Sequence, residues 1–211
     1  MDGIIKTVSL VIATKNKGKV SEISHFLKDS DTKLFSLNDF DGLPDIIEDG
    51  SNFQENSIKK AKTSAEALKI LTLADDSGLE VDFLGGNPGV YSARYSGENA
   101  TDASNRVKLL SELAEVNDIN RRSARFVCHL VLWDPQKGIL FETDGICEGN
   151  IGFEEKGSGG FGYDCIFIPS GYDLTMAQLS EDVKNEISHR GKALKNFSDF
   201  LKKNNPDFSY K

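Results

Sequence analysis

The sequence is short of cysteine and has no long apolar run. Its three cysteines, Cys128, Cys147 and Cys165, lie far apart and form no CxxC pair. This excludes a disulfide framework and a zinc site, and it predicts a reduced, cytoplasmic compartment. The longest apolar stretches fall well short of the roughly 20 residues that a membrane-spanning helix needs. The N-terminus carries Asp2 and no small-residue cleavage site, which does not fit a signal peptide. We therefore expect a cytoplasmic protein with no membrane partner.

Positive charge is also scarce. The chain has 25 lysines and arginines against 33 aspartates and glutamates, a net charge of −8. Such a protein does not bind DNA, RNA or an anionic membrane through its general field, so we expect no nucleic-acid partner. Any phosphate that it binds must be held by a local cluster of cations or backbone N–H groups.

No linker, composition break or repeat divides the 211 residues, which predicts one domain or one domain with two lobes. Apolar periodicity predicts helices over 20–27, 58–68, 107–113 and 187–201, and strands over 8–14, 125–133, 139–147 and 163–169. A further strand is expected to end at 73–74, and the turn at 134–138 makes a hairpin of the strands beside it. The order predicts a mixed α/β fold and excludes a purely alternating parallel sheet.

The first predicted strand runs into a cationic turn, Thr14-Lys15-Asn16-Lys17-Gly18-Lys19, which opens the first predicted helix. A helix N-terminus offers free N–H groups and a partial positive charge, so it binds phosphate readily. The turn is not a Walker A loop, because Ala13 stands where that motif needs glycine and Val20 where it needs serine or threonine. The alternative is a solvated, lysine-rich turn.

Two adjacent carboxylates, Asp75 and Asp76, follow the predicted strand end at 73–74. Carboxylates in such a place favour a hard cation such as Mg²⁺. Neighbouring side chains on extended backbone point to opposite faces, so one carboxylate can face a site while the other secures the turn. The alternative is a simple turn, since Ser77-Gly78 follows directly.

The stretch Gly157–Gly162 matches the GxGxxG pattern, but it precedes a predicted strand and not a helix, which excludes a dinucleotide-binding fingerprint. A flat base could stack on Phe161 or Tyr163; alternatively, Phe161 belongs to the core. Lys184, His189 and Arg190 place three donors on the last predicted helix, which suits an anion or a carbonyl group. For the histidine, the alternative is a capping or surface role.

Together, and in this order, several stretches resemble the inosine triphosphate pyrophosphatase family. They are ATKNKGKVSEI, FQENSIKKA, LADDSGLEVDFLGGNPGVYSARYSG, GSGGFGYDCIF and KNEISHRGKAL, and they extend from residue 13 to residue 194. The resemblance implies an elongated, two-lobed α/β fold over residues 1–211, with a mixed sheet flanked by helices and a central cleft. It also implies a homodimer that uses Mg²⁺ to hydrolyse ITP, dITP and XTP to the monophosphate and pyrophosphate, and so cleanses the nucleotide pool.

The resemblance also implies roles for individual residues. Asp76 binds the metal and takes the proton from the attacking water, while residues Thr14, Lys15, Asn16, Lys17, Gly18 and Lys19 hold the triphosphate. Glu55, Asn56 and Lys60 match a further family motif near the metal and the phosphates. The remaining substrate contacts are Ser77, Phe161, Gly162, Tyr163, Asp164, Lys184, His189 and Arg190.

The sequence departs from the family at one point. Many relatives carry an acidic metal ligand three residues before Gly50, where this chain has Ile47. Glu48 or Asp45 could supply that carboxylate, or the metal could rely on Asp76, Glu55 and water.

Base choice is expected at the 6-position of the purine. Hypoxanthine and xanthine present a carbonyl acceptor there and adenine an amino donor, so donors such as His189 and Arg190 favour the former. Two other functions stay open: a pyrophosphatase for other modified nucleoside triphosphates, and a non-catalytic nucleotide-binding module that would not need Asp76.

Overall fold

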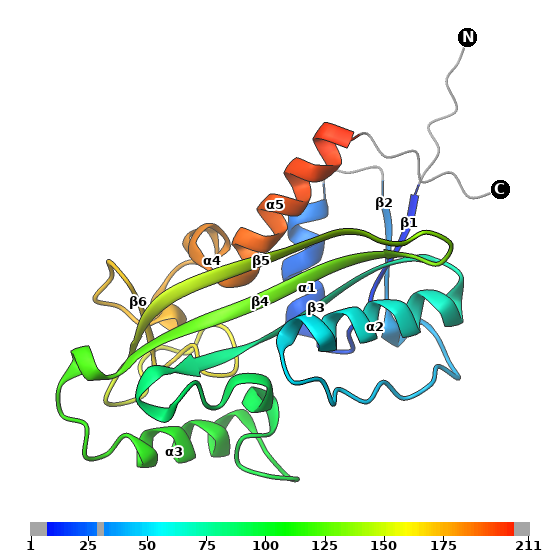
Figure 1. The fold of residues 1–211 in the computed structure, drawn as a ribbon. Helices are drawn as coiled ribbons and strands as arrows, with labels where there is room; N and C mark the ends of the chain where they lie inside the picture. The colour runs from blue at the N-terminus through cyan, green and yellow to red at the C-terminus, as the bar shows by residue number, and fades with distance from the viewer. Residues whose placement is uncertain (1–7, 29–31, 205–211) are drawn as a thin grey trace.

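The computed structural model describes residues 8–28 and 32–204, whose strands form one six-stranded sheet in the order β2-β1-β3-β4-β5-β6 (Figure 1). Strand β1 pairs in parallel with β2 and β3, and the pairs β3–β4, β4–β5 and β5–β6 are antiparallel. The strands are β1 (Val8–Ile12), β2 (Thr32–Ser36), β3 (Leu71–Val81), β4 (Ser123–Asp134), β5 (Gly138–Ile151) and β6 (Phe167–Pro169). The predicted mixed α/β class and the β4–β5 hairpin are confirmed.

Helices cover both faces of the middle of this sheet. The α-helices are α1 (Lys17–Leu27), α2 (Phe53–Leu68), α3 (Asp102–Glu112), α4 (Glu181–Ile187) and α5 (His189–Asn204). Alternation along the strands sorts the apolar side chains, because Val11 and Ala74 pack with Ala61 of α2, while Leu10 and Leu73 pack in the cluster of α1 and α5. The sheet therefore has α2 on one face and the α1–α5 pair on the other (Figure 1).

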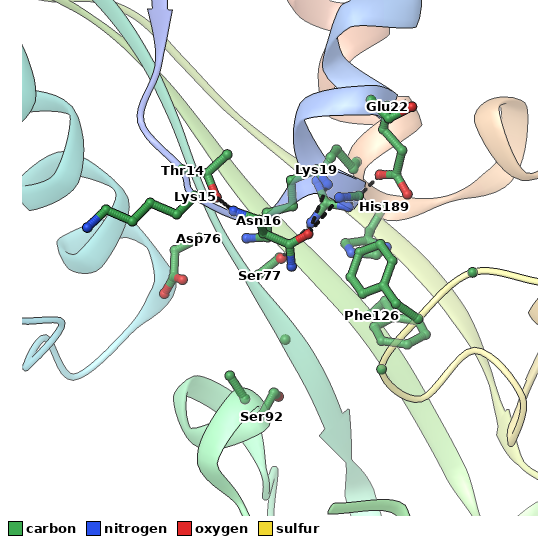
Figure 2. A pocket seen from close by; sticks show the side chains of 18 of the residues that line it. Thr14, Lys15, Asn16, Lys19, Glu22, Asp76, Ser77, Ser92, Phe126 and His189 are labelled. Atoms are coloured by element: carbon green, nitrogen blue, oxygen red, sulfur yellow. Dashed lines mark hydrogen bonds and ion pairs between the residues drawn. The ribbon is translucent and has the colours of Figure 1, made fainter. Parts of the chain in front are cut away.

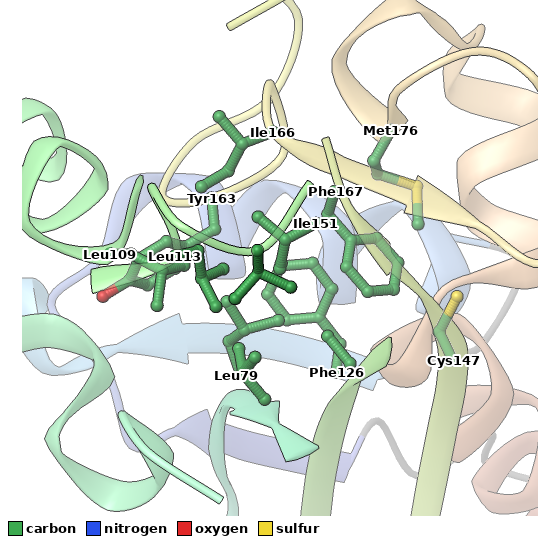
Figure 3. Packing of buried hydrophobic residues seen from close by; sticks show 13 residues of the cluster. Leu79, Leu109, Leu113, Phe126, Cys147, Ile151, Tyr163, Ile166, Phe167 and Met176 are labelled. Carbon is green, nitrogen blue, oxygen red and sulfur yellow. The ribbon is translucent and has the colours of Figure 1, made fainter. Parts of the chain in front are cut away.

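The long strands extend beyond these helices into a separate core. Leu79, Phe126 and Ile151 from the strands meet Leu109 of α3 and Phe167 of β6, and all five are buried (Figure 3). The middle of β3 thus lies between two packed regions, and its polar residues Asp75, Asp76 and Ser77 fall at that point.

Two strand predictions were wrong in extent. The strand predicted to end at 73–74 continues to Val81, because β4 pairs with it from Thr72 to Val81 and keeps the polar stretch extended. The predicted strand 163–169 is reduced to β6, since Tyr163 begins a turn in which its carbonyl accepts from the N–H groups of Ile166 and Phe167.

The helix predictions also needed correction. The last helix breaks at Ser188, whose extended backbone separates α4 from α5 and divides the predicted donors between two helices. The helix predicted over 107–113 is α3, which begins after its N-cap Thr101; Val107 is exposed on it and Leu109 is buried. The sequence analysis did not predict strand β2.

No helix in residues 8–28 and 32–204 combines the length and apolarity that a bilayer crossing requires.

Candidate active site

A cleft of about 940 Å³ opens beside the middle of β3, between the two packed regions (Figure 2). The start of α1, the face of α2, the segment 159–164 and the α4–α5 junction all line it. The cleft brings together all the predicted substrate and metal residues except Lys17 and Glu55, which do not line it. Side chains from residue 14 to residue 190 therefore share one cavity.

The cationic turn is organised by its own asparagine. Asn16 is the N-cap of α1, and its Oδ1 accepts from the N–H groups of Gly18 at 2.8 Å and Lys19 at 3.2 Å. Gly18 also allows a close approach, because a Cβ there would lie 3.1 Å from the ring of Phe161. The turn therefore presents lysine side chains and a helix N-terminus to the cleft, with Phe161 beside it.

Asp76 faces α2. Its Oδ1 accepts from Nζ of Lys60 at 2.9 Å, and its Oδ2 accepts from Nδ2 of Asn56 at 3.1 Å. The same Lys60 ammonium donates to Oε2 of Glu48 at 2.9 Å, so one cation joins two carboxylates at the cleft wall. Burial raises the pKa of the Asp76 carboxyl although Lys60 acts to lower it. A carboxylate with a raised pKa is a better proton acceptor.

Of the two glutamates that the sequence offered as metal ligands, Glu48 lines the cleft beside Lys60, whereas Glu55 does not line it. The carboxylate of Glu55 accepts from the N–H of Ser51 at 2.7 Å and from Nδ2 of Asn52 at 3.1 Å, so it serves the start of α2. Burial acts to raise the pKa of Glu48, but Lys60 outweighs it and the pKa lies below its ordinary value.

The carboxylates at the cleft suit a Mg²⁺ ion whose coordination shell is completed by phosphate oxygens of the substrate. The described residues contain no cluster of three or more histidine, cysteine or carboxylate side chains that could hold a metal by themselves. Mg²⁺, however, is usually bound through one or two carboxylates together with substrate phosphates and water. Glu48 and Asp76 supply two carboxylates against the single charge of Lys60, which suits such an ion.

Asp75 points to the opposite face of β3 and has a role that sequence reasoning missed. Its Oδ2 accepts from Nζ of Lys19 at 2.9 Å and from Nη2 of Arg190 at 3.0 Å, and burial acts against these cations, which hold the pKa of Asp75 well below its ordinary value. Arg190 also donates to Glu22 at 2.6 Å and to Oγ of Ser77 at 2.9 Å. Asp75 therefore fixes two predicted substrate cations and secures no turn.

The glycine-rich segment separates the two aromatic candidates. Tyr163 is buried and its hydroxyl donates to the carbonyl of Ser92 at 2.8 Å, so it cannot offer a free face to a base. Phe161 is 37% exposed and lies 6.0 Å from the guanidinium carbon of Arg190. Of the two predicted stacking residues, only Phe161 is available.

The segment is held from outside by α3, which the sequence did not indicate. The N–H of Gly162 donates to Asp102 at 2.8 Å, and its carbonyl accepts from Arg106 at 2.9 Å. Next to it, Asp164 accepts from Nζ of Lys184 at 2.9 Å. Both peptide groups of Gly162 are thus fixed next to Phe161.

His189 forms the wall opposite Asp76 (Figure 2). Its ring stacks on Phe126 with the centroids 4.8 Å apart, and its Nδ1 finds no hydrogen-bond partner among the described residues. Burial, together with the neighbouring Arg190, lowers the pKa of His189 well below 6.5. The imidazole is therefore neutral at pH 7, and its Nδ1 is buried without a hydrogen-bond partner among the described residues.

The fold and the cleft define an α/β protein with a cationic helix N-terminus facing a pair of carboxylates. The chain belongs to the Ham1 family, whose model matches residues 10–200. Two similar relatives are the dITP/XTP pyrophosphatases of Oceanobacillus iheyensis (47% identical, covering 91% of this chain and 97% of the relative) and Desulfotalea psychrophila (51% identical, covering 88% and 81%). The resemblance stated from the sequence is thereby confirmed.

Solved structures agree with this assignment. The HAM1 protein from Coxiella burnetii superposes with a TM-score of 0.85 at 40% identity, covering 93% of this chain and all 100% of that one. The Ham1 protein of Staphylococcus aureus gives a TM-score of 0.82 at 40% identity, covering 92% and 98%. The mixed sheet with its flanking helices is thus the fold of this family.

Proposed function

We propose that this protein hydrolyses ITP, dITP and XTP to the nucleoside monophosphate and pyrophosphate, by attack of water at the α-phosphorus. The observation that carries the proposal is the single cleft in which the start of α1 faces the Glu48–Lys60–Asp76 group, with Phe161 and His189 beside them. The similar relatives are dITP/XTP pyrophosphatases, and this supports the substrate class.

The cationic side of the cleft would hold the triphosphate. A triphosphate carries about four negative charges, and its hydrolysis depends mainly on positioning and charge neutralisation. Lys15 is exposed and lines the cleft. Lys19 also lines the cleft, where its ammonium group pairs with Asp75. Lys17 would contribute through its charge alone, because it does not line the cleft.

The carboxylate side would hold Mg²⁺ and the water. Glu48 and Asp76 are the residues that would bind the ion, which supplies charge neutralisation and lowers the pKa of bound water. Asp76 accepts the proton from the attacking water, and Lys60 keeps the two carboxylates together until substrate arrives.

Base selection would depend on Phe161 and His189. The exposed face of Phe161 offers a stacking surface, and the neutral imidazole of His189 can donate to a carbonyl group through its protonated nitrogen. Arg190 orients this wall through Ser77 and Asp75. A site built on such donors discriminates against an amino group by a factor on the order of 10⁴.

A substrate panel tests the proposal. Pyrophosphate release is measured with ITP, XTP, dITP, GTP, ATP and modified pyrimidine triphosphates, with and without EDTA. We expect EDTA-sensitive turnover with ITP and XTP far above ATP. Equal kcat/KM for ITP and ATP would contradict the base selection, turnover of the pyrimidines alone would indicate another house-cleaning pyrophosphatase, and no turnover would leave a nucleotide-binding module.

We also propose that the chain acts as one two-lobed unit and as a homodimer. The one sheet that connects the packed regions supports the first statement, and the family resemblance supports the second. Light scattering during gel filtration tests the dimer, for which the chain mass of 23.2 kDa would double.

A further inference from the structure

The segment that carries Glu48 has no regular structure of its own. Residues 41–52 contain no helix or strand, so contacts alone position this carboxylate. Lys60 binds its Oε2, Arg94 donates to its backbone carbonyl at 3.1 Å, and Asp49 pairs with Lys59 at 2.5 Å. Asp76, in contrast, lies within strand β3, where it pairs with His129 of β4. The distance between Glu48 and Asp76 therefore depends on the contacts that connect this segment to β3 and α2.

Asn56 makes that connection with its two amide atoms. Its Nδ2 donates to Oδ2 of Asp76 at 3.1 Å, and its Oδ1 accepts from the N–H of Gly50 at 2.8 Å. Gly50 lies only two residues after Glu48. The side chain of Asn56 is 1% exposed, so neither bond competes with bulk water. The buried amide of Asn56 therefore connects the carboxylate of Asp76 to the backbone of Gly50, which lies next to Glu48.

The residue types suit this bridge. Only an amide side chain offers a carbonyl acceptor and an NH₂ donor together. Asn56 and Lys60 are four residues apart on α2 and so share a face, from which Lys60 joins the charges and Asn56 joins the backbone. Gly50 is needed on the other side, because a Cβ there would lie 2.7 Å from Oδ1 of Asn56.

We infer that Asn56 is a positioning residue that sets the separation of Glu48 and Asp76 and thereby their joint affinity for a divalent cation. The inference rests on the proposed function, and it names the residue that organises the pair without itself contacting substrate. Groups that orient the ligands of a metal typically change its affinity by a factor of about 10 to 100 when they are removed.

The test measures cation binding and catalysis separately in Asn56→Ala. We expect the Mg²⁺ concentration for half-maximal ITP hydrolysis to rise on the order of tenfold. Mn²⁺ binding to the protein without nucleotide, followed by the loss of the free-ion EPR signal, should weaken by a similar factor. The KM for ITP at saturating Mg²⁺ should change by less than about threefold, because Asn56 does not hold the triphosphate.

A second variant covers the case in which Asn56→Ala does not fold. Gly50→Ala leaves Asn56 and Asp76 unchanged but pushes the segment away from the amide, so it should weaken Mn²⁺ binding in the same direction. Asn196→Ala is the matched control, because it removes an exposed side-chain hydrogen bond from Asn196 of α5 to Thr143 of β5. It should leave both measurements at the wild-type values.

The outcomes separate the two proposals. Wild-type Mn²⁺ affinity and Mg²⁺ requirement in a folded Asn56→Ala or Gly50→Ala protein would overturn the role of Asn56, whatever the substrate is. A wild-type protein that binds Mn²⁺ but releases no pyrophosphate from any triphosphate would overturn the proposed function, while the binding measurements still decide on Asn56.

Discussion

At the scale of single residues, the two neighbouring aspartates of β3 have different tasks because strand geometry sends them to opposite faces. Asp76 meets Lys60 and Asn56 at the cleft, whereas Asp75 is enclosed by Lys19 and Arg190. The two residue types alone do not distinguish these tasks, and only the family resemblance points to Asp76 as the metal ligand. Burial raises the pKa of Asp76, whereas Lys19 and Arg190 outweigh burial at Asp75 and hold its pKa well below the ordinary value.

Replacing Asp76 with asparagine tests the chemistry of that carboxylate. Asp76→Asn keeps the shape but removes the proton acceptor, so kcat should fall by a factor on the order of 10² to 10⁴. Binding of a non-hydrolysable ITP analogue, measured by calorimetry, should change much less, because the cations of α1 remain. Near-normal turnover in a folded variant would remove Asp76 from the proposed mechanism.

His189 gives a prediction about pH and stability. In the folded protein the pKa of His189 lies below 6.5. As the pH falls below 6.5, His189 therefore becomes protonated in the unfolded chain but stays neutral in the folded protein. The free energy of unfolding should therefore be unaffected by His189 above about pH 6.5. Below that pH it should decrease by up to about 1.4 kcal/mol per pH unit.

His189→Gln should therefore flatten this part of the stability curve, measured as urea unfolding between pH 5 and 7.5. The comparison variant is His25→Gln, which changes an exposed histidine of α1. If the wild type and His189→Gln lose stability in parallel as the pH falls, the neutral state of His189 is wrong.

At the scale of elements, β5 and α5 approach more closely than any side chain would permit. Gly145 lies in β5 opposite the start of α5, where a Cβ would come within 2.0 Å of the carbonyl oxygen of His189. The helix that carries His189 and Arg190 is seated directly on the strand backbone. The position of His189 and Arg190 thus depends on a glycine far from them in sequence.

Gly145→Ala should displace the start of α5. We expect a loss of about 1–3 kcal/mol in the free energy of unfolding, typical of overpacking, and a reduced ratio of kcat/KM for ITP over ATP. Gly152→Ala is the control, because the atoms nearest to its new Cβ are 3.4 Å away or more. Equal selectivity in the two folded variants would show that α5 does not depend on this contact.

At the scale of the whole molecule, the cleft joins parts that belong to different hydrophobic clusters. Gly18 and Lys19 belong to α1, which packs with α5, whereas Phe161 and Gly162 are tied to α3 by Asp102 and Arg106. A nucleotide that contacts both sides should therefore stabilise the molecule as a unit.

Hydrogen exchange tests this arrangement. A non-hydrolysable ITP analogue at 100 times its Kd should raise the free energy of unfolding by about 2.7 kcal/mol. With Mg²⁺ present, it should slow exchange both at 16–20 and at 159–163. The same experiment with the ATP analogue should give weaker protection at 159–163. Protection confined to one of the two segments with the ITP analogue would contradict a shared site.

The sequence by itself determined the fold class, the family and a set of site residues, all of which line the cleft except Lys17 and Glu55. Local signals sufficed here: the apolar periodicity of α1 and α2, the hairpin turn after β4, and motifs whose order along the chain is specific. These signals depend on neighbouring residues, so they can be read without knowing the packing.

Only the tertiary structure decided how those residues are used. Strand pairing with β4 keeps Asp75 and Asp76 extended, where the sequence alone indicated a turn. Burial takes Tyr163 into the core, leaves Phe161 exposed and lowers the pKa of His189. The preference for Glu48 over Glu55, and the anchoring of Arg190 by Asp75, depend on contacts between distant segments. No local pattern encodes such contacts, because they arise only when strands and helices pack against one another.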